Sequence, residues 1–317
     1  MVQDAFHGRR ALVTGAAGFI GAALCARLAG LGAQVHGVSR HAGRGGDSLR
    51  WWQADLADSA ATDQVVANVQ PDYVFHLAGA VTGSRDLDVV RDTLAGNLCS
   101  AVNLLVACQR AGRSKLVMAG SLEEPPPEDS QPVPASPYAA SKWAASGYAR
   151  MFHALYGARV AVARIFMVYG PGQRDVRKLV PYVCLAALRG EPPELMSGAR
   201  LVDWIFVDDV VEGLLAVALS PVDDGRHVDI GTGELVTTGE VATRICRLAG
   251  GLVAPRLGAR ADRPMEQVRR ADPDAAESAT GWRARVALDD GLARTLQWYR
   301  RYHLSVAGDD TGELRRC

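Results

Sequence analysis

The chain has very little lysine and no excess of charge of either sign. Of its 35 basic residues only three are lysines, Lys115, Lys142 and Lys178, and the basic residues balance 35 acidic ones. A net charge of zero gives no indication of a nucleic acid or an anionic membrane as partner, so we expect neither. The scarcity of lysine makes each of the three a residue to examine.

Cysteine pairs and long apolar runs are also missing. The six cysteines are scattered along the chain and form no C-x-x-C pair. This spacing argues against a zinc site or a disulfide framework and favours a reducing compartment. Residues 1–10 carry no apolar signal region, and no apolar run is long enough to cross a bilayer. We therefore expect a cytoplasmic protein without a bound metal.

Glycines stand where the first strand turns into the first helix. Ala11–Val13 is a short apolar run, and residues 19–31 have apolar side chains at helical spacing. Gly15 permits a tight turn, Gly18 lets a pyrophosphate approach the backbone, and Gly21 lets the helix pack close to the sheet. Such turns also occur without a ligand, but this strand-turn-helix setting predicts a dinucleotide site. Further residues expected to line it are Ala17, Phe19 and Ile20.

The end of the second strand bears on which dinucleotide binds. The strand at 34–38 is followed by Ser39 and Arg40, with Arg44 close behind, where an NAD-dependent enzyme usually has an acidic residue. A hydroxyl and a cation suit the 2′-phosphate of NADP, so the sequence favours NADP(H) over NAD(H). The alternative is that both arginines are ordinary solvated loop residues.

The third strand, at 51–54, ends in a further candidate cofactor contact. Asp55 follows it together with Leu56. The carboxylate can accept a hydrogen bond from the adenine amino group, or it can cap the helix that begins near Ser59. Asp55 and Leu56 are therefore predicted to lie at the adenine.

The fourth strand, at 72–77, contains His76, which we interpret as a packed core histidine. It runs into Ala78 and Gly79, small residues that suit a backbone passing under a cofactor. A long helix is expected at 87–111.

A tyrosine and a lysine lie one helical turn apart after a proline-rich loop. Ser136 and Pro137 predict the start of a helix, on which Tyr138 and Lys142 share one face. An ammonium near a phenol lowers its pKa, and the phenol can then exchange a proton with an alcohol or ketone oxygen near neutral pH. Ser121, at the end of the fifth strand, can add a second hydrogen bond to that oxygen. We predict that Ser121, Tyr138 and Lys142 are catalytic.

Motifs along nearly the whole chain resemble those of one enzyme group. The matching segments are Thr14–Gly21, His76–Gly79, Asn97, Ser121, Tyr138–Lys142, Arg164–Gln173, Asp203–Val210, Ile230–Glu234 and Arg263–Pro264. In number and order they resemble the extended short-chain dehydrogenase/reductase superfamily, in its nucleotide-sugar epimerase, dehydratase and reductase group. The resemblance implies an α/β fold: a Rossmann-type doubly wound parallel sheet with a smaller C-terminal α/β substrate-binding lobe.

The resemblance also implies how the chain is divided. An NADP-binding Rossmann domain is expected over 1–170, with 203–232 returning to it, and a substrate-binding lobe over 171–202 and 233–304. Residues 305–317 are expected to form a flexible tail. A sixth strand is expected at 159–168. The family's subunits commonly pair through two long helices each, here 87–111 and 137–155, which implies a homodimer through a four-helix bundle.

The site residues implied by the resemblance belong to two sets. Besides Tyr138 and Lys142, the cofactor set includes Leu77, Ala78, Gly79, Asn97 and Ile165. A nucleotide-diphosphate sugar is the implied substrate, and Arg263 resembles the arginine that grips its diphosphate, because an arginine fork fits a diphosphate bidentately. Arg174 and Arg200 are weaker candidates whose alternative is a plain surface charge. The other implied substrate contacts are Thr82, Glu123 and Met167, and the family often has Asn in place of Met167.

The residues after Ser121 separate the possible reactions. In one type of 4,6-dehydratase an adjacent acid and base follow this position, but here Leu122 stands in place of the acid before Glu123. The run Gly-Ser-x-Glu-Glu resembles 4-ketoreductases, which use exchanging NADPH, in agreement with Arg40. Our first hypothesis is an NADPH-dependent 4-ketoreductase of a nucleotide-activated 4-keto-6-deoxyhexose. The alternatives are a 4-epimerase or 4,6-dehydratase with tightly bound NAD(P), and a non-catalytic NADP-binding sensor.

Overall fold

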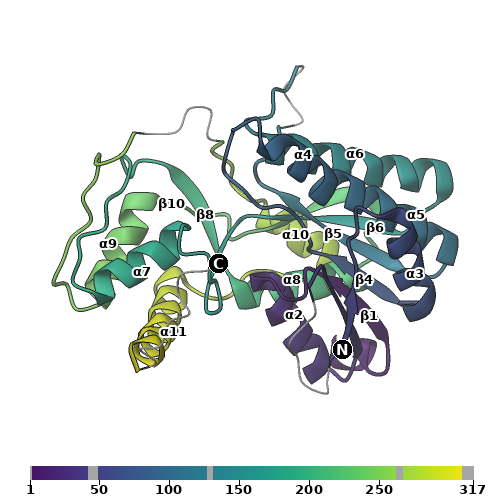
Figure 1. Ribbon diagram of the computed structural model, residues 1–317, viewed down its shortest axis with the longest axis horizontal. Helices are drawn as coiled ribbons and strands as arrows, with labels where there is room; N and C mark the ends of the chain where they lie inside the picture. Colours follow the sequence, from purple (N-terminus) through teal and green to yellow (C-terminus); the bar gives the residue numbers. More distant parts are fainter. Residues whose placement is uncertain (1, 42–48, 127–130, 262–266, 309–317) are drawn as a thin grey trace.

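The computed structural model describes residues 2–41, 49–126, 131–261 and 267–308 (Figure 1). Within these residues, seven parallel strands form one sheet in the order β3-β2-β1-β4-β5-β6-β9. From β3 to β6 this is the order of two dinucleotide-binding halves joined in one sheet, which confirms the predicted Rossmann-type fold. The strands are Arg10–Thr14 (β1), Gln34–Ser39 (β2), Leu49–Gln53 (β3), Tyr73–His76 (β4), Lys115–Ser121 (β5), Val160–Ile165 (β6) and Asp224–Ile230 (β9).

Helices cover both faces of this sheet because its strands are apolar on both sides. Along β1, Leu12 packs into the core on one side and Val13 into the core on the other. The side of Leu12 is covered by α3 (Ser59–Val69), α5 (Ser100–Ala111) and α6 (Pro137–Tyr156). The side of Val13 is covered by α1 (Val2–Phe6), α2 (Phe19–Gly30), α8 (Val207–Leu219) and α10 (Pro273–Thr280). Figure 1 shows α2 and α8 next to each other on this side.

A smaller lobe lies beside the large sheet, at the left in Figure 1. Of the described residues, three strands form its sheet in the order β10-β8-β7. Val183, Ile245 and Leu292 join its helices in one core. The last helix continues to Gly308, past the expected end of the lobe at 304, and the rest of the expected tail lies outside the described residues. The elements are Met167–Tyr169 (β7), Leu179–Leu188 (α7), Leu201–Phe206 (β8), Leu235–Thr237 (β10), Thr238–Leu248 (α9) and Leu288–Gly308 (α11).

The expected sixth strand at 159–168 is two strands in two sheets. The amide of Phe166 donates to the carbonyl oxygen of Ile230 at 3.0 Å, which ends the pairing with β9. The next residue, Met167, pairs with Trp204 of β8. Phe166 is buried in the core of the large sheet and Tyr169 in the core of the lobe. An apolar run that serves two cores in succession looks like one strand in the sequence.

The expected helix at 87–111 is also interrupted. It consists of α4 (Val89–Thr93), a π-helical segment η1 (Leu94–Cys99) and α5. The π-helical turn carries Asn97, whose Oδ1 accepts from the amide of Ala80 at 2.7 Å and whose Nδ2 donates to Ser141 Oγ at 2.9 Å. Single π-helical turns often occur at functional sites. Here the wider turn lets one buried amide group join the loop after β4 to α6.

Candidate active site

The glycine turn after β1 leaves no room for side chains. Gly15 has φ +66°, and a Cβ placed there would lie 2.8 Å from the amide nitrogen of Ala78. A Cβ on Gly21 would lie 2.1 Å from the carbonyl oxygen of Gly15. The amide of Gly18 donates to that same carbonyl oxygen at 2.9 Å, and no side chain caps the start of α2 there. The backbone therefore offers the positive end of α2 to an anion, which fits the predicted pyrophosphate position.

The end of β4 is fixed against this turn by a buried histidine. The amide of Ala78 donates to Thr14 Oγ1 at 3.1 Å, and Thr14 Oγ1 lies 2.8 Å from His76 Nδ1. Because burial and the charge of Lys142 lower the pKa of His76 to about 3, its ring is neutral at pH 7 and Nδ1 can accept the Thr14 proton. His76 is a core residue, as predicted.

Three residues that are predicted to contact the cofactor, Gly79, Asn97 and Lys142, lie close to one another. A Cβ on Gly79 would lie 2.6 Å from Asn97 Oδ1 and 3.7 Å from Lys142 Nζ. The loop after β4, the π-helical turn and α6 therefore meet at this glycine. A flat ring could lie on the exposed backbone of Gly79 with Lys142 beside it.

Ser121 and Tyr138 meet at the end of β5. Their side chains are hydrogen-bonded, and Ser121 Oγ also accepts from the amide of Glu123 at 3.2 Å. Ser136 Oγ accepts from the amide of Ala139 at 3.1 Å and so caps the helix that carries Tyr138. The serine and the phenol expected to share one substrate oxygen are thus adjacent.

The pKa of Tyr138 does not follow the expectation from the sequence. Burial raises it most, the hydrogen bond with Ser121 acts in the opposite direction, and the carboxylates of Glu123 and Glu124 add to the rise, so that the pKa is about 12. Lys142 Nζ instead donates to the carbonyl oxygen of Ala119 at 2.9 Å. The expected lowering of the phenol pKa by Lys142 is therefore wrong for this arrangement, because the ammonium is held by a backbone carbonyl.

The pKa of Lys142 is also strongly shifted from its ordinary value. Its side chain is buried, which lowers its pKa to about 8, while the nearby Glu124 carboxylate acts to raise it. At pH 7 the ammonium is therefore still mostly charged.

The two glutamates after Ser121 have different surroundings. Glu123 is half-buried, whereas Glu124 is 1% exposed and accepts the amide of Ser121 at 2.8 Å. Leu122 packs into the core beneath the sheet. Glu123 is therefore the only residue of this run that presents a carboxylate without burying it.

The residues predicted to bind the adenine end of the cofactor follow the ends of β2 and β3. Arg40 is exposed just beyond the last residue of β2, and Ser39 is half-buried. The carboxylate of Asp55 accepts from the amide of Ala57 at 3.0 Å, and Asp58, not Asp55, caps α3. Leu56 is buried in the core that lies on the Leu12 side of the sheet. Arg44 lies outside the described residues.

The predicted substrate contacts are less closely grouped. Thr82 is half-buried in the loop after β4, and its Oγ1 accepts from the amide of Ser84 at 3.0 Å. Met167 packs against the cores of both the large sheet and the lobe, whereas Ile165 is buried in the former. Arg174 is exposed and Arg200 is half-buried. Arg263 lies outside the described residues.

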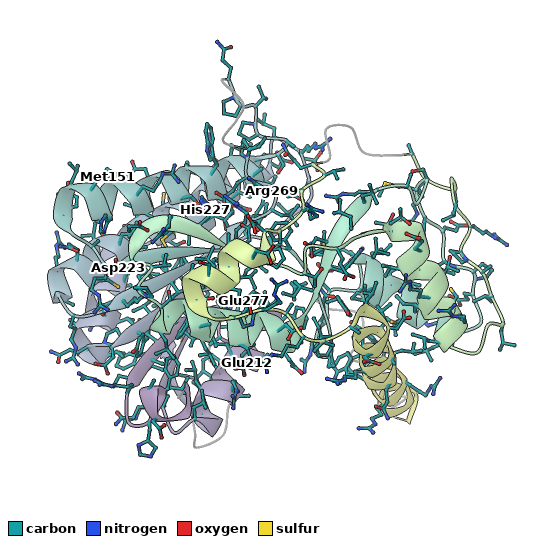
Figure 2. All side chains as sticks on the ribbon, turned by 180° about the vertical axis from the view of Figure 1, so that it is seen from behind. Met151, Glu212, Asp223, His227, Arg269 and Glu277 are labelled. Carbon is teal, nitrogen blue, oxygen red and sulfur yellow. The ribbon has the colours of Figure 1, made fainter. Side chains whose placement is uncertain are left out.

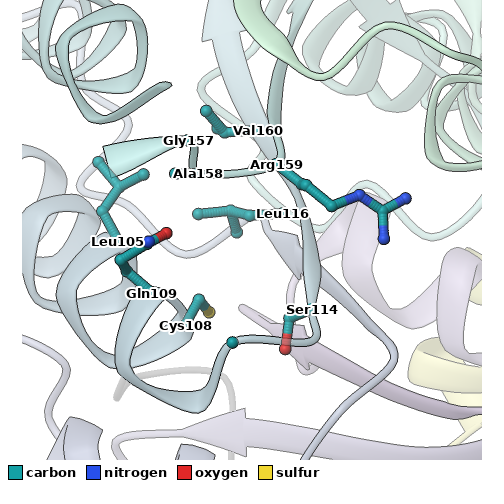
Figure 3. A pocket seen from close by; sticks show the side chains of 10 residues that line it. Leu105, Cys108, Gln109, Ser114, Leu116, Gly157, Ala158, Arg159 and Val160 are labelled. Atoms are coloured by element: carbon teal, nitrogen blue, oxygen red, sulfur yellow. The ribbon is translucent and has the colours of Figure 1, made fainter. Parts of the chain in front are cut away.

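A cavity of about 110 Å³ lies at the opposite edge of the sheet (Figure 3). Leu116 and Val160, near the starts of β5 and β6, line it together with Cys108 of α5. Ligands of parallel α/β sheets bind at the carboxyl ends of the strands, so this cavity is separate from the candidate site. In the described part of the chain no group of three or more possible metal ligands is found, and no helix is long and apolar enough to cross a membrane.

Several polar residues of the site were not predicted from the sequence. Thr14, Ser141 and Glu124 are all buried and hydrogen-bonded to segments that carry predicted residues. Their signal is a polar side chain within an apolar or small-residue run. That signal shows that a residue needs a partner but does not identify the partner.

The chain matches a family model and curated proteins over most of its length. Residues 11–231 match the model of the NAD dependent epimerase/dehydratase family. The chain is 32% identical to the UDP-glucose 4-epimerase of Mycolicibacterium smegmatis, over 92% of this chain and 98% of that one. It is 30% identical to the probable dTDP-glucose 4,6-dehydratase of Sinorhizobium fredii, over 92% of each.

The chain is also similar to a solved structure. MoeE5 in complex with UDP-glucuronic acid and NAD superposes with a TM-score of 0.81 at 35% identity. The match covers 92% of this chain and 99% of MoeE5.

Proposed function

Because the chain belongs to the NAD dependent epimerase/dehydratase family, we propose that it is a 4-epimerase of a nucleotide-diphosphate hexose. The nucleotide-sugar epimerase/dehydratase character follows from the family and the relatives; the choice of 4-epimerization is our inference. The relatives favour this alternative over the 4-ketoreductase that we placed first on the sequence. The adjacent Ser121 and Tyr138 argue against a non-catalytic sensor, which has no need of a phenol held on a serine.

The residues present fit a nicotinamide dinucleotide. Gly15, Gly18 and Gly21 keep the turn free of side chains, and the start of α2 suits a pyrophosphate. Asn97 and Lys142 approach Gly79, where the nicotinamide end of the cofactor would lie. When bound in its oxidised form, the nicotinamide would accept the hydride from C4 of the sugar, place a positive charge in the site, and later return the hydride.

The proton of the sugar hydroxyl is handled by this chain's own side chains. As the C4–H bond breaks, Tyr138 takes the proton of the 4-hydroxyl, and it returns the proton when the 4-keto group is reduced from the opposite face. Ser121 donates a hydrogen bond to the same oxygen. Lys142, whose Nζ donates to the carbonyl oxygen of Ala119, would hold the nicotinamide end of the cofactor, and the positive charge of the nicotinamide would favour the phenolate form that the first step requires.

One observation carries the choice of epimerization over dehydration. Elimination of water from the sugar needs an acid for the leaving hydroxyl and a base at C5. Leu122 and Glu124 flank Glu123, but one is apolar and the other is buried and saturated with hydrogen bonds. Glu123 alone is a poor candidate for both roles, whereas epimerization asks for neither.

The proposal is tested by incubating the purified protein with UDP-, dTDP- and GDP-hexoses and following the products by proton NMR. We expect the C4 epimer of one of them to appear with no net change in NADH or NADPH absorbance. Continuous loss of NADPH with a 4-keto-6-deoxyhexose nucleotide would instead establish the ketoreductase. Appearance of a 4-keto-6-deoxy product would establish the dehydratase.

We further propose that NADP is the preferred dinucleotide. The family model and MoeE5 name NAD, but this chain has Ser39 and Arg40 at the end of β2, with no acidic residue there. Replacing Arg40 with alanine is expected to raise the Kd of NADP⁺ about tenfold, in proportion to one lost phosphate contact of about 1.4 kcal/mol, and to leave that of NAD⁺ unchanged. Calorimetric titration measures both. Tighter binding of NAD⁺ by the unaltered protein would refute the preference.

We also propose a homodimer built on α5 and α6. Along α6, Trp143 and Tyr148 are exposed at 38% and 40% of their surfaces, and the end of the helix exposes Leu155 and Tyr156. Light scattering after gel filtration should give twice the chain mass, and Trp143→Glu should give the monomer because it puts a charge into an apolar interface. A monomeric unaltered protein contradicts this. A cytoplasmic location stays a prediction that rests on the scattered cysteines.

A further inference from the structure

A carboxylate that takes no part in the proposed chemistry lies directly behind the reacting side chains. Glu124 is 1% exposed, and its Oε1 accepts the amide of Ser121 at 2.8 Å. Gly120 makes room for it, because a Cβ on Gly120 would lie 2.8 Å from Glu124 Oε1. Burying a charge costs folding free energy unless hydrogen bonds compensate it. We therefore ask which groups compensate the Glu124 carboxylate at the end of β5 and what it does there.

The second oxygen of Glu124 is held by two other elements of the fold. His227 Nε2 of β9 lies 3.0 Å from Glu124 Oε2 and 3.2 Å from Ser146 Oγ of α6. Ser146 is also hydrogen-bonded to the Glu124 carboxylate. These contacts lower the pKa of Glu124 despite its burial, so the group is an anion at pH 7. Since an anionic carboxylate only accepts, Nε2 of His227 donates in this contact.

The backbone of Glu124 is tied to a fourth segment. Its carbonyl oxygen accepts from Nη1 of Arg269 at 3.0 Å. Arg269 lies on the stretch that leads from the smaller lobe into α10, and Figure 2 shows it next to His227 on the side opposite to that of Figure 1. One residue thus joins β5, α6, β9 and the chain returning from the lobe.

We propose that Glu124 is a positioning residue: held by His227, it fixes the Ser121–Glu123 segment so that the Ser121 hydroxyl faces Tyr138. The inference rests on the proposed function and adds to it a group that does not touch the substrate. The link is short, because the same Ser121 whose amide binds Glu124 gives its side chain to the phenol. A shift of about 1 Å at such a group can cost about 100-fold in rate.

The charge of Glu124 also shifts the pKa values of Tyr138 and Lys142. It raises the pKa of Tyr138, in the same sense as Glu123, and it raises the pKa of Lys142 against the effect of burial. The Arg269 guanidinium binds the carbonyl oxygen of Glu124, and an ion pair of Arg164 with Asp229, at 2.8 Å, lies on the strands β6 and β9. Removing the charge of Glu124 while keeping its shape should therefore lower the pKa of Tyr138.

Two substitutions separate position from charge. Glu124→Gln keeps an acceptor for the Ser121 amide and removes the charge, whereas Glu124→Ala removes both. We expect kcat to fall about 10- to 100-fold in Glu124→Ala at nearly unchanged KM, and less in Glu124→Gln. We also expect the titration midpoint of Tyr138, followed by NMR of ¹³C-labelled tyrosine and assigned with Tyr138→Phe, to move to lower pH in Glu124→Gln. Glu212→Gln, which breaks an exposed ion pair with Arg27, is the matched control.

Two results would overturn the inference. One is a folded Glu124→Gln with the kcat and the Tyr138 midpoint of the unaltered protein. The other applies if neither Glu124 variant folds. In that case His227→Gln, which leaves the Glu124 charge in place, is measured instead, and an unchanged kcat of this variant would overturn the inference. Because the tyrosine titration needs no substrate, it tests the role of Glu124 even if no nucleotide sugar is turned over, a result that would refute the proposed function alone.

Discussion

Replacing Tyr138 with phenylalanine is expected to lower kcat by about 10²- to 10⁴-fold, the range that a general acid-base group contributes. The substitution removes one oxygen atom and leaves a ring that fills the same space beside Ser121. Dinucleotide affinity and thermal stability should stay close to those of the unaltered protein, because no hydrogen bond of the glycine turn involves Tyr138 among the described residues. The measurement is the rate of formation of the C4 epimer at saturating substrate.

The pH dependence of the same rate gives an independent check. Burial and two carboxylates raise the pKa of Tyr138 to about 12 in the ligand-free protein, so few molecules carry the phenolate at pH 7. A positive nicotinamide nearby lowers that pKa, and the unaltered enzyme should therefore become faster as pH rises through the neutral range. In Tyr138→Phe this rise should be absent from whatever rate remains.

The control for this prediction is Tyr148→Phe on the same helix. Tyr148 is 40% exposed, and the substitution removes the same atom from a ring far from Ser121 along α6. It should leave the rate and its pH dependence unchanged. If both variants are as active as the unaltered enzyme, Tyr138 is not the proton-transfer residue and the proposed mechanism is wrong.

Local patterns predicted those parts of the fold that depend on neighbours in sequence. The glycine turn, the cap at Ser136 and the buried strands follow from spacing and backbone geometry, and the structure has them as expected. The interrupted helix at 87–111 could not be predicted, because the π-helical turn exists to bring Asn97 against Ala80 and Ser141. Its cause is a contact between segments far apart in the chain.

The same limit applies to the candidate site. The spacing of Tyr138 and Lys142 predicted that they share a helix face, but the lysine's partner, the carbonyl of Ala119, belongs to another element. The pKa of the phenol was therefore predicted in the wrong direction. Glu124 was visible in the sequence only as one of two adjacent glutamates, and its partners His227 and Arg269 lie more than 100 residues away along the chain.

Replacing Gly21 with alanine is expected to have the largest effect on stability. The added Cβ would lie 2.1 Å from the carbonyl oxygen of Gly15 and 3.0 Å from Cα of Ala16, and both are backbone atoms that cannot rotate away. Relief requires α2 to move off the turn, which we expect to cost about 3 kcal/mol of unfolding free energy. Because the carbonyl of Gly15 also accepts from the amide of Gly18, the phosphate-binding turn should be distorted as well.

Chemical denaturation and dinucleotide titration measure the two effects, and Gly30→Ala in the same helix is the matched control. Gly30 has nothing within 4 Å of an added Cβ, so alanine there should be neutral or stabilising by about 0.5 kcal/mol through its better helix propensity. Both substitutions add one methyl group to α2 in place of a glycine. A difference between them therefore reports the close approach of helix and turn, and equal stability of the two variants would show that α2 does not pack on the turn at this distance.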